Sequence, residues 1–238
     1  MMSDDRTFVG VDLAATTFRD VDLSQTIMRG VMLSAGDIDG VISGLKVNGV
    51  EVAPLIEAEL DRMFPERLLL RPTNQAELVT AIDTVESMWS ETLQRAFMLD
   101  DSDLHRSVGG EWSFVETLRH LVFVTDAWFL RSVLDLDMFH PLGLPPTFLP
   151  RDVAPTIDPE ADPSIDDVME ARNDRFGRLQ SYAKEVSDAD LGHPLMATTR
   201  DGFPPARERT PLECLHVLCS EEWAHHRYAV RDLNKLET

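Results

Sequence analysis

From residue 53 onward, apolar residues recur at the three- and four-residue spacing of core-facing helices. The clearest stripe lies in a helix predicted over residues 74–99, capped by Thr73 or Asn74, and consists of Leu78, Ile82, Val85, Trp89, Leu93 and Ala96. Four more helices are predicted: over 53–64, from Ser113, over 164–186 from a Ser164 cap, and from Thr210 to about Leu236. Ser113 and Thr210 each begin a capping box, with Glu three residues later. Four long helices with long crossover segments predict a four-helix bundle, so the fold class is mainly α.

Residues 8–45 follow a different pattern, with a period of five. Apolar residues occupy every fifth position in the series Phe8, Leu13, Phe18, Leu23, Met28, Leu33 and Ile38. A second register, two residues earlier, holds Val11, Val21, Val31 and Val41. Five is neither the helical period of about 3.6 nor the strand period of 2. It suits a square solenoid with one face per repeat and the central apolar residue pointing inward. An irregular β-rich segment is the alternative.

The five-residue pattern resembles the pentapeptide-repeat family, which implies a short right-handed β-solenoid. Its repeats are degenerate, and about two coils are too few to bury a core alone, so we expect the solenoid to lean on the rest of the chain. A hairpin with an Asn48-Gly49 turn is predicted directly after it. The chain is therefore predicted to have three parts: a pentapeptide-repeat-like β segment (1–52), a linker with a short helix (53–72) and the bundle (73–238).

Two segments of the predicted bundle stand out by composition. The helix that begins at Ser113 continues as TLRHLVFVTDAWFLRSVL, which is apolar nearly all round and predicts the most buried helix. The segment 141–163 contains seven of the fourteen prolines. It is too long for a tight turn, and we expect a lid or belt over the bundle.

The predicted last helix has a polar interruption in its core stripe, which runs Leu212, Leu215, Cys219, Glu222, His226, Ala229 and Leu233. Burying an unpaired carboxylate is costly, so Glu222 needs a hydrogen-bonding partner, a cation or a metal. A carboxylate and an imidazole at i and i+4 converge on one point beside a helix, as in helix-borne metal sites. A solvent-exposed Glu–His pair without a ligand role is the alternative.

His120 is a second polar residue at a predicted core position, seven residues after the Ser113 cap. With Glu222 and His226 it would supply N, O and N ligands and leave coordination positions open. That composition is typical of a catalytic divalent-metal site rather than a closed structural one. A core histidine satisfied by a neighbouring polar group is the alternative.

The segments EWSFVETLRHLVFVTDAWF and HVLCSEEWAHHRYAV together resemble the DinB-like superfamily of four-helix bundles. That superfamily is similar to the mycothiol-dependent maleylpyruvate isomerases and the bacillithiol S-transferases. The resemblance covers roughly residues 75–235. In the family, one His follows a Glu-Trp-Ser-like helix start, and His120 matches it. Two further His lie four residues apart in the last helix; the second matches His226, and the position of the first holds Glu222.

Glu222 is therefore a departure from the family pattern. A carboxylate can replace an imidazole as a ligand, but it adds negative charge and weakens the preference for softer metals. A shift of one residue would give Glu221 and His225 instead. We prefer Glu222 and His226 as ligands because they continue the core stripe.

The resemblance implies a metal-assisted thiol reaction. A divalent metal, with zinc or nickel as first candidates, would bind a low-molecular-weight thiol such as mycothiol, lower its pKa and present a thiolate to an electrophilic small-molecule substrate. The candidate pocket residues are Cys219, His225, Trp112 and Trp128.

Charge and cysteine content limit the classes of partner and the cellular compartment that we expect. The 42 acidic and 22 basic residues give a net charge of −20, which disfavours nucleic-acid and membrane-surface partners. Cys214 and Cys219 lie five apart in a predicted helix and point different ways, so no disulfide is expected. Residues 1–7 have no apolar signal-peptide core, and no run of 18 apolar residues occurs. We expect a cytoplasmic protein, with a homodimer as one candidate assembly.

Three function hypotheses stay open at this point. The first is a metal-dependent S-transferase or isomerase. The second is a non-catalytic binding or regulatory protein on the same scaffold that has lost the metal, with Glu222 and His226 as a buried hydrogen-bonded pair. The third treats the acidic solenoid as a nucleic-acid mimic, for which two coils are short.

Overall fold

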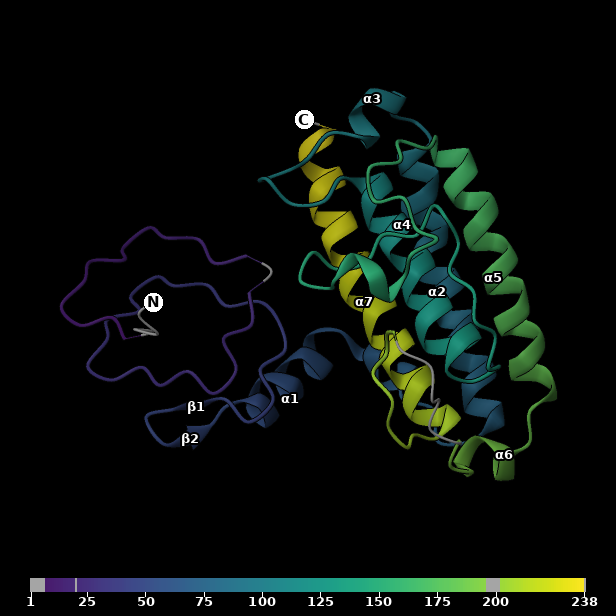
Figure 1. Ribbon diagram of the computed structural model, residues 1–238, viewed down its shortest axis with the longest axis horizontal. Helices are drawn as coiled ribbons and strands as arrows, with labels where there is room; N and C mark the ends of the chain where they lie inside the picture. The colour runs from purple at the N-terminus through teal and green to yellow at the C-terminus, as the bar shows by residue number, and fades with distance from the viewer. Residues whose placement is uncertain (1–6, 20, 196–201, 238) are drawn as a thin grey trace.

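A bundle of four helices dominates the computed structural model, which describes residues 7–19, 21–195 and 202–237 (Figure 1). The bundle helices are α2 (Gln75–Ala96), α4 (Phe114–Thr125), α5 (Ile165–Glu185) and α7 (Pro211–Leu236). α4 continues without interruption into a π-helical turn, η2 (Asp126–Arg131). The predicted mainly helical fold is confirmed. The prediction that the N-terminus has no signal-peptide core depends mostly on residues 1–6, which lie outside the described residues.

The bundle helices begin where the capping residues predict. The side chains of Asn74, Ser113, Ser164 and Thr210 each accept a hydrogen bond from a backbone N–H of the first turn. The last three also form reciprocal capping boxes, with Glu or Asp at the third position. These caps satisfy amide groups that a helix leaves unpaired at its start.

The core lies where the four bundle helices meet, and α4 is the most enclosed of them: nearly every residue from Phe114 to Thr125 is buried. Fully buried side chains include Leu78, Ile82, Leu118, Leu121, Leu215 and Leu218. The predicted stripe of α7 also faces inward, with Leu215, Cys219, Glu222, Ala229 and Leu233 all buried. Both cysteines are buried free thiols.

The proline-rich segment, residues 141–163, packs against α4. It is irregular except for one short 3₁₀ turn, η3 (Arg151–Val153). The backbone N–H of Leu144 donates to the carbonyl of Arg119 in α4, at 3.1 Å. The guanidinium of Arg119 in turn donates to carbonyls of Leu142, Asp158 and Ala161. The segment therefore lies as a belt along one side of the bundle.

The N-terminal segment lies apart from the bundle and is linked to it through α1 (Ala53–Met63) (Figure 1). The predicted hairpin is present as β1 (Lys46–Val47) and β2 (Val50–Glu51), with Val47 opposite Val50. Within residues 7–19 and 21–45 the structure contains no strand. Contacts from this region to the bundle side include a hydrogen bond from Arg19 to the carbonyl of Gly109, at 3.0 Å, and one between Tyr228 of α7 and Asp39.

The predicted solenoid is not confirmed, although the backbone does repeat. Left-handed residues recur at multiples of five, at Gly10, Ala15, Gln25, Gly30, Ala35 and Gly40. The apolar residues of the repeat are nevertheless exposed, from Leu13 and Leu23 at 44% to Val41 at 97%. The five-residue period thus governs the turns, but within residues 7–19 and 21–41 no apolar side chain of the repeat is buried.

The remaining helical elements are short: η1 (Pro65–Leu70), α3 (Asp101–Leu104) and α6 (Asp188–Gly192). Among the described residues, no helix is both long enough and apolar enough to cross a membrane.

Candidate metal centre

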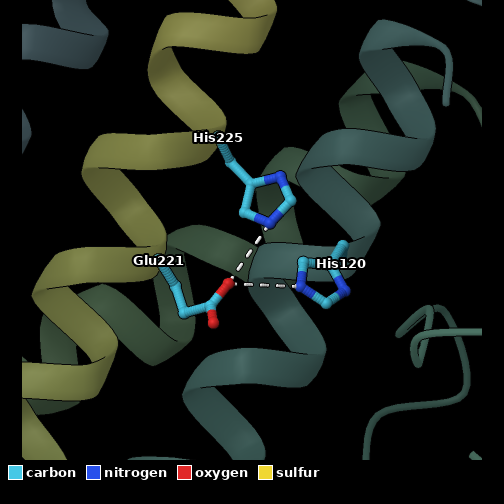
Figure 2. A group of neighbouring side chains, drawn as sticks. All are labelled: His120, Glu221 and His225. Carbon is cyan, nitrogen blue, oxygen red and sulfur yellow. Dashed lines mark ion pairs between the residues drawn. The ribbon is translucent and has the colours of Figure 1, made fainter. Parts of the chain in front are cut away.

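Three potential ligands converge at the contact between α4 and α7: His120, Glu221 and His225 (Figure 2). One ligand atom from each lies within 4.8 Å of the others. Oε2 of Glu221 is 3.2 Å from Nε2 of His225 and 3.6 Å from Nε2 of His120. His120 is buried, His225 is nearly so, and the Glu221 side chain is 36% exposed. The cluster therefore has a buried floor on α4 and an open side at the carboxylate.

Helix geometry explains this convergence. Glu221 and His225 are one turn apart on α7, so their side chains project from the same face of that helix. His120 lies in the second turn of α4, at a depth fixed by the Ser113 capping box, and α4 packs directly against α7. The three side chains thus reach one point from two rigid helices.

The hydrogen bond of His120 fixes which of its ring nitrogens carries a proton. Nδ1 lies 2.9 Å from the backbone carbonyl of Leu144. A carbonyl oxygen only accepts, so Nδ1 must be the protonated nitrogen. In a neutral imidazole Nε2 then carries a bare lone pair, and this nitrogen faces the carboxylate of Glu221. Two acceptors facing each other repel unless a proton or a metal cation lies between them.

Burial makes a proton on Nε2 unfavourable. Desolvation lowers the pKa of His120 below its ordinary value of 6.5, despite the opposing effect of Glu221. Burial alone would raise the pKa of Glu221, but hydrogen bonds and charges from His120 and His225 outweigh it and lower the pKa to about 2. At neutral pH the site therefore presents an anionic carboxylate and a neutral imidazole, the protonation states in which these groups bind metals.

The donor set fits a divalent metal. Two ligands at about 2.1 Å from a tetrahedral metal are about 3.4 Å apart, and the two nitrogen–oxygen separations here are 3.2 and 3.6 Å. The bond from His120 to the Leu144 carbonyl is the outer contact that metal-binding histidines usually make. Three protein ligands leave at least one coordination position open.

Aromatic rings enclose the two imidazoles. The ring of Trp112 lies 4.7 Å from that of His120 and 6.0 Å from that of His225, between centroids. Tyr228 contacts His225 edge-on at 5.6 Å. Trp112, a candidate pocket residue from the sequence, is thus part of the site, as is His225. Both rings limit the rotamers of the imidazoles and leave the carboxylate as the accessible side.

From the sequence we prefer His120, Glu222 and His226 as ligands. The structure instead brings His120 together with Glu221 and His225, so the two α7 residues are each shifted by one position. Glu222 is 1% exposed and forms a bidentate ion pair with Arg172 of α5, at 2.6 and 3.0 Å. It also accepts a hydrogen bond from Nε1 of Trp89, at 2.8 Å. Both oxygens of the Glu222 carboxylate are occupied by protein donors, so the charge is compensated without a metal.

His226 also has a partner elsewhere. Its Nε2 lies 2.9 Å from the hydroxyl of Thr92 in α2, and its ring packs edge-on against Trp89 at 5.1 Å. In place of the hydrogen-bonded pair of Glu222 and His226 considered from the sequence, Glu222 is bonded to α5 and α2, and His226 is bonded to α2.

Two further pocket candidates lie away from the three ligands. Cys219 is fully buried in the core, where burial and the charge of Glu222 raise the pKa of its thiol to about 12. A thiol in that state is a small apolar side chain rather than a ligand. Trp128 packs edge-on against Phe203 and lies under the guanidinium of Arg209. It packs in the part of the core next to the proline-rich segment.

Comparison with known protein families defines the class of this bundle. The model of the DinB superfamily matches residues 84–229, more than half of the chain and all three residues of the cluster. The chain belongs to the DinB superfamily. Searches of curated proteins and of solved structures give no match to the chain.

The protonation states predict a pH dependence for the metal-free protein. Folding lowers the pKa of His120, so below about pH 6.5 the unfolded chain binds a proton more readily than the folded protein does. The free energy of unfolding therefore decreases as the pH is lowered. Glu221 contributes stability above about pH 4.5, which is lost as pH falls toward 2. In urea unfolding with a chelator present, we expect His120→Ala to flatten the decline between pH 7 and pH 5. Equal slopes for the wild type and the variant would contradict this assignment.

Proposed function

We propose that the protein binds a divalent metal through His120, Glu221 and His225 and uses its open coordination positions for chemistry on a small molecule. The observation that carries the proposal is the bare Nε2 of His120 facing the ionised Glu221 at 3.6 Å. A metal cation between these atoms turns a repulsive contact into two bonds. In contrast, the neighbouring carboxylate of Glu222 is already neutralised by Arg172.

We further propose a metal-dependent S-transfer or isomerisation that uses a low-molecular-weight thiol. Membership of the DinB superfamily and the resemblance to thiol-dependent isomerases and transferases support this reaction class. A metal bound here would supply a Lewis acid that lowers the pKa of a thiol beside it. The chain's own residues would hold the two imidazoles rigid beneath Trp112 and direct the approach to the exposed side of Glu221.

Elemental analysis of the protein, purified without a histidine tag, tests the metal assignment. We expect about one zinc or nickel ion per chain in the wild type, and no stoichiometric metal in His120→Ala or His225→Ala. His216→Ala is the matched control because His216 also lies on α7, but its Nε2 is bonded to the carbonyl of Pro72, at 2.6 Å. The control should keep the metal.

Two results would count against the proposal. One is a wild-type protein that takes up no metal even after incubation with zinc or nickel salts. The other is metal that survives both cluster substitutions. If the metal is confirmed, the thiol proposal is tested next, by screening thiols with electrophilic substrates for turnover that a chelator abolishes.

A further inference from the structure

Arg119 is a buried arginine that binds backbone carbonyls instead of a carboxylate. It is 3% exposed. Its Nε donates to the carbonyl of Leu142 at 3.0 Å, and its two terminal nitrogens donate to the carbonyls of Ala161 at 2.5 Å and Asp158 at 2.8 Å. All three carbonyls belong to the proline-rich segment. A buried guanidinium is costly to desolvate, and the three hydrogen bonds offset part of that cost while they constrain an otherwise irregular stretch of chain.

Other buried arginines of the bundle have a different role. Arg172 pairs with Glu222 and Arg175 pairs with Asp126, so each neutralises a buried carboxylate and joins two helices. Arg119 instead joins a helix to a loop segment. Its donors are spread over carbonyls that lie as many as 19 residues apart in sequence, from Leu142 to Ala161.

The segment held by Arg119 contains the carbonyl that orients His120. Leu144 donates its N–H to the backbone carbonyl of Arg119 at 3.1 Å and accepts from Nδ1 of His120 at 2.9 Å. Between Leu142 and Leu144, a Cβ on Gly143 would lie 3.2 Å from the carbonyl of His140 and from Ile157, and 3.4 Å from Cβ of Phe123 in α4. The residues that lead into this carbonyl are therefore held to α4 at Leu142 and at Leu144.

We propose that Arg119 is a positioning residue for the metal centre, which acts by holding the Leu144 carbonyl against His120. The carbonyl keeps the proton on Nδ1 and so leaves Nε2 free to bind the metal. The three side-chain bonds of Arg119 act on Leu142, two residues before this carbonyl, and on the far end of the same segment, and so add to the backbone bond of Leu144 in fixing its direction. This inference rests on the proposed metal-binding function for its consequence, but the state of the His120 ring is measurable without any metal.

The test uses the full chain labelled with ¹⁵N-histidine, in which nitrogen chemical shifts distinguish the two neutral tautomers of each imidazole. The metal-free wild type should show His120 as the Nδ1–H tautomer. Methionine in Arg119→Met is a long, unbranched side chain without hydrogen-bond donors. In this variant we expect a substantial fraction of His120 to be the Nε2–H tautomer. Arg119→Lys keeps the charge but cannot reach three carbonyls, so we expect an intermediate result. Zinc affinity should fall about tenfold or more in Arg119→Met, as for loss of an outer contact to a ligand.

Arg151→Met is the matched control, since Arg151 lies in the same segment and its ion pair with Glu160 is exposed to solvent. It should leave both the tautomer and the zinc affinity unchanged. If Arg119→Met does not fold, Arg119→Lys carries the comparison. An unchanged His120 tautomer and unchanged zinc affinity in the Arg119 variants would overturn the inference while leaving the metal site intact. If the wild type binds no zinc, the proposed function fails, and a tautomer change in the Arg119 variants still supports the positioning role.

Discussion

Glu222→Gln is expected to destabilise the protein by about 3 kcal/mol or more, because it leaves the Arg172 guanidinium buried without a counter-charge. Arg172 and Glu222 are both almost fully buried, and the two form the bidentate pair that joins α5 to α7. Glutamine keeps the shape and the acceptor for Trp89, so the loss reports charge rather than a cavity. For a chain of this size the melting temperature should fall by roughly 10 °C.

The substitution Glu221→Gln, at the adjacent residue, should have the opposite effects on stability and on metal binding. The Glu221 side chain is partly exposed, so its ion pairs contribute little, under about 1 kcal/mol. A glutamine amide can also donate to the bare Nε2 of His120, which removes a repulsive contact. We expect the metal-free variant to lose no more than about 1 kcal/mol of stability and to lose metal binding, whereas Glu222→Gln should keep its metal. Thermal unfolding and metal content of both variants decide between the two roles. A stable Glu222→Gln protein without metal would reverse our assignment.

The comparison of these two residues shows where sequence reasoning reached its limit. The three- and four-residue spacing correctly identified the inward stripe of α7, including the buried positions of Cys219 and Glu222. The preference for Glu222 and His226 as metal ligands rests on their continuing this stripe. The structure compensates Glu222 with Arg172, from a different helix 50 residues away in sequence. Such a pairing depends on how the helices pack, which periodicity on one helix does not encode.

The candidate metal cluster lies instead at the edge of the stripe. Glu221 and His225 have the same i, i+4 spacing as Glu222 and His226, so spacing alone could not choose between the two registers. The signal that could have favoured the edge is His120 itself. A ligand on a neighbouring helix meets α7 at the helix–helix seam, and side chains beside the core stripe line such a seam. The contribution of the Leu144 carbonyl could not be read from the sequence, since it depends on the path of an irregular segment.

The N-terminal segment shows a different limit. Its five-residue period is visible in the sequence and recurs in the backbone, as left-handed residues such as Ala15, Gln25 and Ala35. Period alone does not determine how much surface a short array buries, because repeats bury their apolar faces mainly against further repeats. Phe18, for example, remains 57% exposed. The turns were therefore predictable, whereas a closed solenoid core was not achieved by so few repeats.

Zinc should raise the thermal stability of the wild-type protein in a concentration-dependent manner. A ligand that binds only the folded state stabilises it by about 2.7 kcal/mol at a free concentration of 100 times the dissociation constant. For a chain of this size that corresponds to a rise of roughly 5–10 °C in melting temperature. Because the three candidate ligands come from α4 and α7, a metal bound there would link the two helices directly.

Substitutions of two neighbouring histidines, His225 and His226, test which residues cause the zinc-dependent rise in melting temperature. His225→Ala should abolish the zinc-dependent rise, since it removes a ligand of the cluster. His226→Ala should begin from a lower melting temperature, because it breaks the contact with Thr92, but should keep the full zinc-dependent rise. The measurement is a zinc titration of the melting temperature for all three proteins after chelator treatment. If His226→Ala lost the rise and His225→Ala kept it, the metal would be bound in the register that continues the core stripe, and the buried pair of Glu222 with Arg172 would have to open to admit it.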